Sequence, residues 1–145
     1  MLQFWAGLAA LTMALTGPAR DSEDAPMACT TEDRLPLGRS WLAKANRPDA
    51  VIKPGKLYVT ASEGSPAAYG FTARKAGRYR IASDRKVWIE LSQSGAALAS
   101  ASHQRAAACS GIHKIVDFNL QPGQYSLSFK ETDNAAIKFI IIRAP

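Results

Sequence analysis

From Leu57 to the C-terminus, apolar and polar residues alternate in short runs, and this pattern constrains the fold more than any other feature. Successive side chains of a β-strand point to opposite faces, so a period of two is typical of strands that bury one face. Turn residues, Gly77, Gly95 and Gly123 among them, separate the runs at intervals of roughly 8–12 residues. We therefore predict an all-β fold over residues 57–145: a single antiparallel β-sandwich of jelly-roll type with about eight strands.

The alternation also locates the strands that we expect. They span residues 57–61, 67–74, 78–82, 87–92, 97–102, 112–120, 125–130 and 137–143. The run 137–143 is almost wholly apolar, which is typical of a central strand covered on both faces. In the run 87–92, Val87, Ile89 and Leu91 form the apolar set, which places Trp88 on the solvent-facing or inter-sheet face.

Two of the expected hairpins share a pattern. Tyr79 follows Gly77 by two residues and Tyr125 follows Gly123 by two residues, each pair after an apolar strand. Glycine supplies the positive φ that such turns need, and a tyrosine at the start of a strand can pack its ring while its hydroxyl reaches the rim. The repetition fits either an old internal duplication or the common construction of jelly-roll hairpins.

Cys29 and Cys109 are the two cysteines of the chain. In an oxidising compartment such a pair forms a disulfide, which here would close a loop of about 80 residues and contribute about 4 kcal/mol by chain entropy. A redox pair or a metal site is the alternative, but the chain has no CxxC spacing and has two histidines. We predict a structural disulfide.

The N-terminal residues indicate export. Residues 2–16 carry no charge and are mostly apolar, and Gly17 and Ala19 offer a cleavage site before Arg20. No Lys or Arg precedes the apolar stretch, which departs from the usual signal peptide, and an uncleaved anchor or a buried helix is the alternative. We predict a signal peptide over residues 1–19, and a mature protein that is periplasmic or secreted and not integral to the membrane.

Residues 20–56, which we call the N-terminal arm, show no regular pattern. Clustered acidic residues and four prolines punctuate this segment. A short helical turn over residues 40–44 would end soon before Pro48. We expect the arm to lie over the sandwich, where Cys29 pins it.

Charge narrows the range of partners. Lys and Arg number 18 against 12 Asp and Glu, a net charge of +6. No basic run is interleaved with aromatic residues, so we expect no nucleic-acid partner. The segment 102–114 is a polar and cationic loop tied down by a cysteine, and loops of this kind carry function. The candidate ligand-binding residues are His103, Arg105, His113, Lys114 and Trp88.

These residues suit a glycan, an anionic surface or another envelope protein as the partner. Trp41, Tyr58 and Tyr69 would extend the site if they joined Trp88 in an aromatic platform for a sugar or peptide. The alternative is that Trp88 belongs to the core, that Tyr79 and Tyr125 pack their hairpins, and that Arg78 and Arg80 lie on solvent-exposed strand faces.

The chain carries little that suggests catalysis. It has no nucleophile elbow, no phosphate-cradling loop and no spacing that brings two carboxylates together. A non-haem iron site needs two histidines and a carboxylate. His113 and Asp117 would face the same side of a strand but lie about 13 Å apart by strand rise. We therefore predict no catalytic residues, no metal and no cofactor, and a non-enzymatic binding or accessory protein.

The motifs resemble those of known proteins. The two glycine–tyrosine hairpins resemble those of jelly-roll modules of secreted bacterial enzymes, such as pre-peptidase C-terminal and carbohydrate-binding domains. Residues 66–143 are similar to a family of small exported proteobacterial proteins of unknown function. The resemblance rests on AGRYRI at 76–81, VWIEL at 87–91, SH at 102–103, CSGIHKIVDF at 109–118 and PGQYSL at 122–127.

This second resemblance also implies an alternative function. Members of the family often bear the label homogentisate 1,2-dioxygenase, which implies a metal-dependent enzyme. We interpret that label as a propagated error, because ring-cleaving enzymes of that class are far longer. The family usually has Arg at the position of His113 and a His–Gly–His–Gly–Pro-like loop at 102–107, of which His103 alone matches. A subunit of an envelope assembly, joined through strand edges, is a further alternative.

Overall fold

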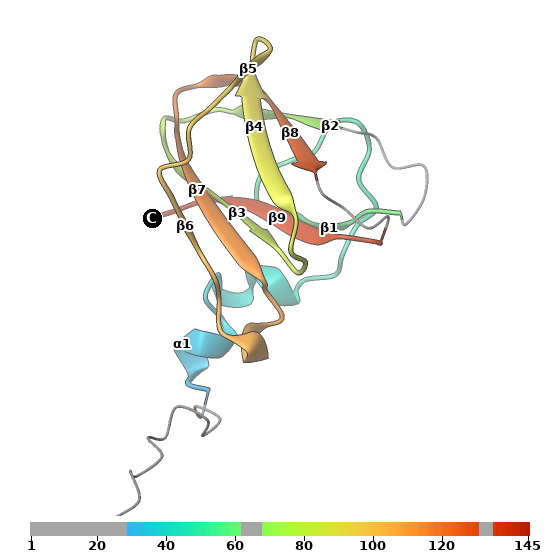
Figure 1. The fold of residues 1–145 in the computed structure, drawn as a ribbon, viewed down its shortest axis with the longest axis vertical. Coiled ribbons are helices and arrows are strands. Elements are labelled where there is room, and N and C mark those ends of the chain that lie inside the picture. Colours follow the sequence, from blue (N-terminus) through green and yellow to red (C-terminus); the bar gives the residue numbers. More distant parts are fainter. Residues whose placement is uncertain (1–28, 62–67, 131–134) are drawn as a thin grey trace, which may run out of the picture.

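A computed structural model describes residues 29–61, 68–130 and 135–145 of the 145-residue chain (Figure 1). The predicted signal peptide and the first part of the arm lie outside these described residues. In the described part, two antiparallel sheets pack face to face, as the alternating pattern predicts.

Nine strands and three short helices make up the described part. The strands are β1 (Leu57–Val59), β2 (Ala68–Ala73), β3 (Gly77–Ser83), β4 (Trp88–Gln93), β5 (Ala96–Ala97), β6 (Ser102–Gln104), β7 (Lys114–Leu120), β8 (Gly123–Lys130) and β9 (Lys138–Arg143). The helices are α1 (Thr31–Arg34) and the 3-10 helices η2 (Gly38–Leu42) and η3 (Ala108–Ser110).

The strand order is that of a jelly roll. One sheet has the order β1-β9-β3-β7-β6 and the other has the order β2-β8-β4-β5. The first half of the domain pairs antiparallel with the second half, starting from the β4–β5 turn. Each pair encloses the next along the chain: β1–β9, β2–β8, β3–β7 and β4–β5. With the short β6 set aside, this is the eight-stranded arrangement that we predict.

Aromatic residues dominate the core between the two sheets. Phe139 lies at its centre, where its ring contacts those of Tyr58, Tyr69 and Phe129 at centroid distances of 5.6, 5.6 and 4.9 Å. A second group joins Phe71 to the rings of Tyr79 and Tyr125. Buried aliphatic residues of both inner faces fill the space between these rings.

Strand β9 is covered on both faces, which confirms the interpretation of its apolar run. Phe139 and Ile141 point into the core between the sheets. Ile140 points outward, into a second buried cluster that contains Leu37 and Trp41 of the N-terminal arm. The arm therefore acts as a third layer over the outer face of the β1-β9-β3-β7-β6 sheet.

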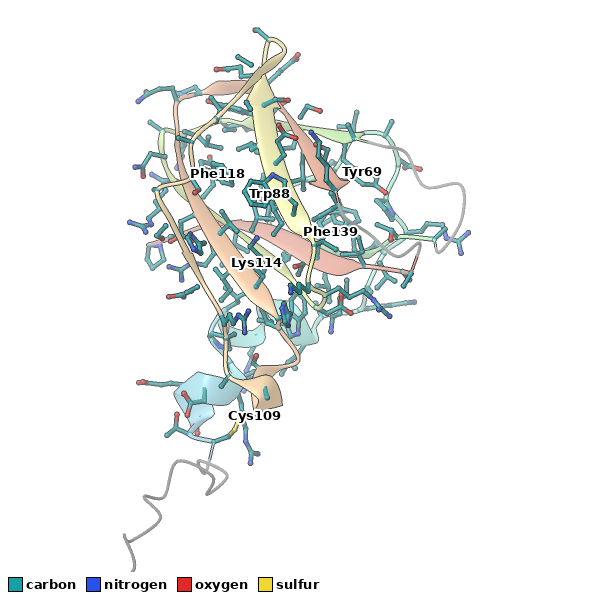
Figure 2. The ribbon with its side chains drawn as sticks, in the orientation of Figure 1. Tyr69, Trp88, Cys109, Lys114, Phe118 and Phe139 are labelled. Atoms are coloured by element: carbon teal, nitrogen blue, oxygen red, sulfur yellow. A yellow bond between two sulfur atoms is a disulfide. The ribbon has the colours of Figure 1, made fainter. Side chains whose placement is uncertain are left out.

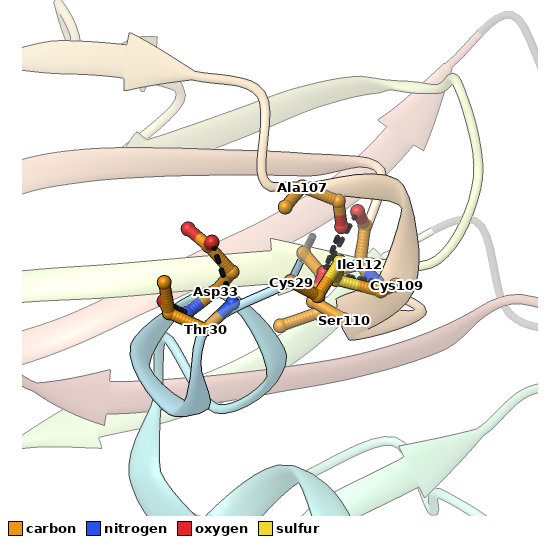
Figure 3. Close-up of a disulfide and its surroundings, with 7 residues drawn as sticks. All are labelled: Cys29, Thr30, Asp33, Ala107, Cys109, Ser110 and Ile112. Carbon is orange, nitrogen blue, oxygen red and sulfur yellow. Dashed lines mark hydrogen bonds between the residues drawn. A yellow bond between two sulfur atoms is a disulfide. The ribbon is translucent and has the colours of Figure 1, made fainter. Parts of the chain in front are cut away.

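The disulfide fastens the arm to the sandwich. Cys29 and Cys109 are bonded, with their Cα atoms 6.5 Å apart, as we predict. Figure 3 shows that the bond joins Cys29, the residue before the N-cap of α1, to η3, next to the capping box in which the Thr30 and Asp33 side chains accept hydrogen bonds from each other's backbone amides. The Ser110 hydroxyl, close by, donates to the carbonyl of Ala107 at 2.6 Å.

The arm also covers two strand edges. Asn46 pairs with Tyr58 of β1, and Val51 pairs with Gly70 of β2, both in parallel bridges. Each bridge occupies the outer edge of a strand that begins its sheet in the order given above. Unpaired edges invite association with other chains, so the arm protects this side of the sandwich.

The two glycine–tyrosine hairpins are built alike. The Tyr79 hydroxyl donates to the carbonyl of Lys75 at 2.7 Å, and the Tyr125 hydroxyl donates to the carbonyl of Gln121 at 2.6 Å. Gly77 and Gly123 have φ values of +154° and +158°, which residues with a side chain rarely adopt. Each tyrosine thus packs its ring in the core and ties its hydroxyl to the turn before it.

One expected strand is divided between the two sheets. In place of a strand over 97–102, β5 ends at Ala97 and β6 begins at Ser102. The Leu98 amide donates to the carbonyl of Leu91 in one sheet, whereas the Ala101 amide donates to the carbonyl of Asp117 in the other. The chain therefore crosses from one sheet to the other between Leu98 and Ala101, and it cannot form one continuous strand there.

Candidate ligand-binding groove

A groove of about 450 Å³ opens on the side of the sandwich opposite the arm-covered edges. It lies between β4 of one sheet and β6 and β7 of the other, with the crossing segment 97–100 along its rim. β5 pairs with Ser92 and Gln93 at the end of β4, so no described strand lies beside the first part of β4 on this side. The groove is therefore a consequence of the short β5.

Trp88 and Lys114 meet at this groove from different sheets. The Lys114 ammonium lies 5.1 Å from the centroid of the Trp88 ring and 3.4 Å from the carbonyl oxygen of Val87. Trp88 is 52% exposed. In Figure 2 its ring lies over the space between β4 and β7, near Lys114. A cation above an aromatic face is attracted by the ring quadrupole, so the two side chains hold each other in place.

The charge of Lys114 is uncompensated by the described part of the chain. No carboxylate of residues 29–61, 68–130 and 135–145 lies within ion-pair distance of its ammonium group. Glu90 also lines the groove, but it pairs with Lys130 across the β4–β8 ladder. A ligand with a negative group would therefore find a fixed cation here.

The groove has an apolar floor. Val116 and Phe118 of β7 form it with Ile89 of β4, and Leu98 of the crossing segment lies beside them. His103 is opposite Val116 in the β6–β7 ladder, so its side chain is on the same face of the sheet and lines the same groove. Apolar walls with a few polar groups at the rim are typical of ligand sites.

Three of the five candidate residues thus come together, and two do not. Trp88, His103 and Lys114 line the groove, whereas Arg105 and His113 do not. Arg105 is exposed just after β6. His113 comes just before β7, where its amide donates to the carbonyl of Ser83 at 2.8 Å.

The groove also contains residues that sequence reasoning did not assign to it. Glu90 is not among the predicted ligand-binding residues, and the crossing segment 97–100 is predicted as part of a strand. This segment lacks the β-branched and aromatic side chains typical of strands, which is the signal that the sequence offers. The contacts of Glu90 depend on strand order, which the local sequence does not carry.

The aromatic platform, one of the two alternatives for these residues, does not form. Trp41, Tyr58 and Tyr69 are buried, with exposures of 6% or less. Trp41, which belongs to the arm, packs on the outer face of the five-stranded sheet, and the two tyrosines contact Phe139 in the core. Trp88 alone of the four reaches solvent, which contradicts the interpretation that it belongs to the core.

A separate polar cluster occupies the outer face of β3 and β7. Asp117 accepts hydrogen bonds from Arg78 Nε at 2.6 Å and from Arg80 Nε at 2.9 Å, and Arg78 also reaches Ser102. Burial raises the pKa of Asp117, but the hydrogen bonds from Arg80 and Arg78 outweigh it and hold that pKa below its ordinary value. This carboxylate is therefore charged and fully engaged at neutral pH.

The histidines and Asp117 do not form one site. His103 faces the groove, and Asp117, opposite Ser102 in the same ladder, faces the other side of the sheet. Within the described ranges, no group of three or more His, Cys, Asp and Glu side chains is placed to hold a metal ion. Nor does any described helix have the length and hydropathy needed to cross a membrane.

No protein-family model matches the chain, and no curated protein matches it. Among solved structures, it is similar to the pre-peptidase C-terminal domain of collagenase from Bacillus anthracis. The two share 18% identity over 66% of this chain and 98% of that chain, with a TM-score of 0.44. This likeness concerns the fold alone and carries no argument about function.

Proposed function

We propose that the protein is a non-enzymatic binding protein of the periplasm or the cell exterior, and that its groove takes an acidic glycan. The observation that carries the proposal is the pairing of an exposed tryptophan with an ammonium group that no described carboxylate neutralises. Trp88 and Lys114 lie at the rim of one apolar groove.

The chemistry of the groove suits a sugar that bears a carboxylate. The exposed part of the Trp88 ring offers a flat apolar surface for the C–H face of a pyranose. Lys114 supplies the cation for the carboxylate, and His103 and Glu90 add hydrogen-bonding groups at the rim. The contacts of Lys114 with Trp88 and Val87 fix its position before a ligand arrives, which lowers the entropic cost of binding.

The disulfide supports an extracytoplasmic location. Structural disulfides persist in the periplasm and outside the cell, where thiols are not kept reduced. The Cys29–Cys109 bond closes a loop that spans most of the domain, as a structural bond does. The apolar residues 2–16 and the resemblance of residues 66–143 to small exported proteins agree with this location.

The alternative of an envelope assembly built through strand edges finds less support. The edge strands β1 and β2 are paired with Asn46 and Val51 of the arm. The edge strands on the other side, β5 (Ala96–Ala97) and β6 (Ser102–Gln104), are two and three residues long. Such short edges are a means of preventing association.

Calorimetric titration with trigalacturonate and with neutral maltotriose tests the proposal. We expect Trp88→Ala to abolish binding of both sugars. We expect Lys114→Gln to lower the affinity for trigalacturonate by about tenfold and to leave the affinity for maltotriose unchanged. Lys138→Gln is the matched control, because Lys138 stands 4.5 Å from the ring of the buried Trp41, outside the groove. If Lys138→Gln lowered the affinity for trigalacturonate as much as Lys114→Gln, or if the wild type did not bind trigalacturonate at all, the proposal would be overturned.

A further inference from the structure

A second cavity, of about 610 Å³, lies on the side of the sandwich that the arm closes. Three segments surround it: residues 51–54 of the arm, the turn between β2 and β3, and the end of β9. It shares no residue with the groove of Trp88 and Lys114.

Four cationic side chains converge on this cavity. Lys53 comes from the arm, Arg74 and Lys75 from the β2–β3 turn, and Arg143 from β9. No Asp or Glu among the described residues lines the cavity, and none of their carboxylates pairs with these four side chains. Like charges held together without a counterion raise the local positive potential, which attracts anions.

Apolar surface accompanies these charges. Val51, at the rim, is 68% exposed, and the buried Ile52 and Tyr79 contribute to the wall with Pro54. An exposed aliphatic residue beside a cavity is where a ligand gains from burying an apolar part. The cavity therefore fits a molecule with both anionic groups and an apolar body.

Backbone contacts hold the walls in place. The Ile52 amide donates to the carbonyl of Gly70, and the Gly70 amide donates to the carbonyl of Ala50, each at 2.8 Å. The Tyr79 hydroxyl holds the carbonyl of Lys75, and the Arg143 guanidinium donates to the carbonyl of Ala76 at 2.8 Å. A site whose backbone is already fixed loses little entropy on binding.

We propose that this cavity binds a small organic polyanion, a molecule that joins two or more phosphate, sulfate or carboxylate groups to an apolar body. The planar guanidinium of arginine can donate two parallel hydrogen bonds to two oxygens of such an oxyanion, and the two lysines add mobile charges. The cavity is concave, and its cations come from three segments around it. This arrangement suits a small molecule that enters the cavity better than a flat membrane surface.

Titration of the full chain with pyranine, a trisulfonated pyrene, tests this proposal near neutral pH and about 0.15 M salt. We expect saturable binding of one dye, displaced by inorganic tripolyphosphate. The double variant Arg74→Gln/Lys75→Gln removes two exposed charges and is expected to weaken binding by about tenfold. Arg39→Gln/Lys44→Gln, an equal charge change at exposed arm positions outside the cavity, is expected to leave binding unchanged.

Several outcomes would overturn the proposal. Equal weakening by Arg39→Gln/Lys44→Gln would mean that binding follows net charge alone. Loss of dye binding in Lys114→Gln would place the dye in the other groove. The protein could also sediment with phosphatidylglycerol vesicles. If Arg74→Gln/Lys75→Gln abolished that sedimentation and tripolyphosphate did not compete with it, the four cations would belong to a membrane-binding surface.

Discussion

The ammonium nitrogen of Lys114 lies 5.1 Å from the centroid of the Trp88 ring, although the two residues belong to different sheets. The contact spans the open side of the sandwich, where no described strand pairs with β4 beside Trp88 on the side away from β8. It brings an exposed aromatic ring and a positive charge to the same rim. Our functional account rests on this relationship.

Loss of the disulfide is expected to destabilise the protein strongly. The Cys29–Cys109 bond closes a loop across 80 residues, so the double variant Cys29→Ser/Cys109→Ser should lower the free energy of unfolding by about 4 kcal/mol. Urea denaturation of this variant and of the wild type with and without reductant measures the change. An unfolding midpoint that does not move on reduction would contradict a structural role for the bond.

Trp41 is expected to anchor the arm. It is 2% exposed and packs in the cluster with Ile140 on the outer face of β9. Trp41→Ala should therefore cost about 3–5 kcal/mol. The neighbouring Leu42 is 66% exposed, and Leu42→Ala should change stability by less than about 0.5 kcal/mol. Similar midpoints for the two variants in urea denaturation would show that the arm contributes little.

Asp117 is expected to give a pH-dependent contribution to stability. Its folded pKa is below its unfolded value, so the contribution is complete above about pH 4 and is lost as pH falls through the lowered folded pKa. Asp117→Asn should cost about 2 kcal/mol at neutral pH, because the hydrogen bonds from Arg78 and Arg80 lose their charged acceptor.

Denaturation curves from neutral pH to about pH 2 separate this effect from a general one. The stabilities of wild type and Asp117→Asn should converge at the acid end of the series. The exposed Asp49 provides the matched control, and Asp49→Asn should follow the wild type within about 0.5 kcal/mol. A constant difference between wild type and Asp117→Asn at every pH would contradict the account.

The hydroxyls of the two hairpin tyrosines, Tyr79 and Tyr125, are expected to contribute equally to the free energy of unfolding. Each hydroxyl donates one hydrogen bond to the turn four residues earlier, and each ring stays packed against Phe71 when the hydroxyl is removed. Tyr79→Phe and Tyr125→Phe should each lower the free energy of unfolding by about 1 kcal/mol. The double variant, measured in urea, should show the sum within about 0.5 kcal/mol. Single variants as stable as the wild type would show that the hydroxyls serve no structural purpose.

Much of the fold could be predicted from the sequence because its signals are local. The apolar run that includes Phe139 and Ile140 indicates a strand covered on both faces, and the structure supplies a sheet on one side and the arm on the other. The glycine–tyrosine pairs mark two turns. The segment 97–102 is wrongly predicted as one strand because its crossing is decided by partners in two different sheets, Leu91 and Asp117, and the local sequence does not show which sheet each partner joins.

The candidate site could be predicted less well. Trp88, His103 and Lys114 stood out as exposed or cationic residues near a tethered loop, but their meeting depends on the packing of β4 against β6 and β7. Arg105 and His113 have the same local character and lie outside the groove. The second cavity was missed because its four cations come from three separate segments.

Mapping of amide and indole shifts by NMR on addition of trigalacturonate is the most direct test of the central claim, that the groove between the sheets is the binding site. We predict that the indole N–H of Trp88 and the amides of Leu98, His103 and Lys114 shift together and saturate together. No shift at these residues, or shifts confined to Arg74, Lys75 and other residues of the second cavity, would contradict it.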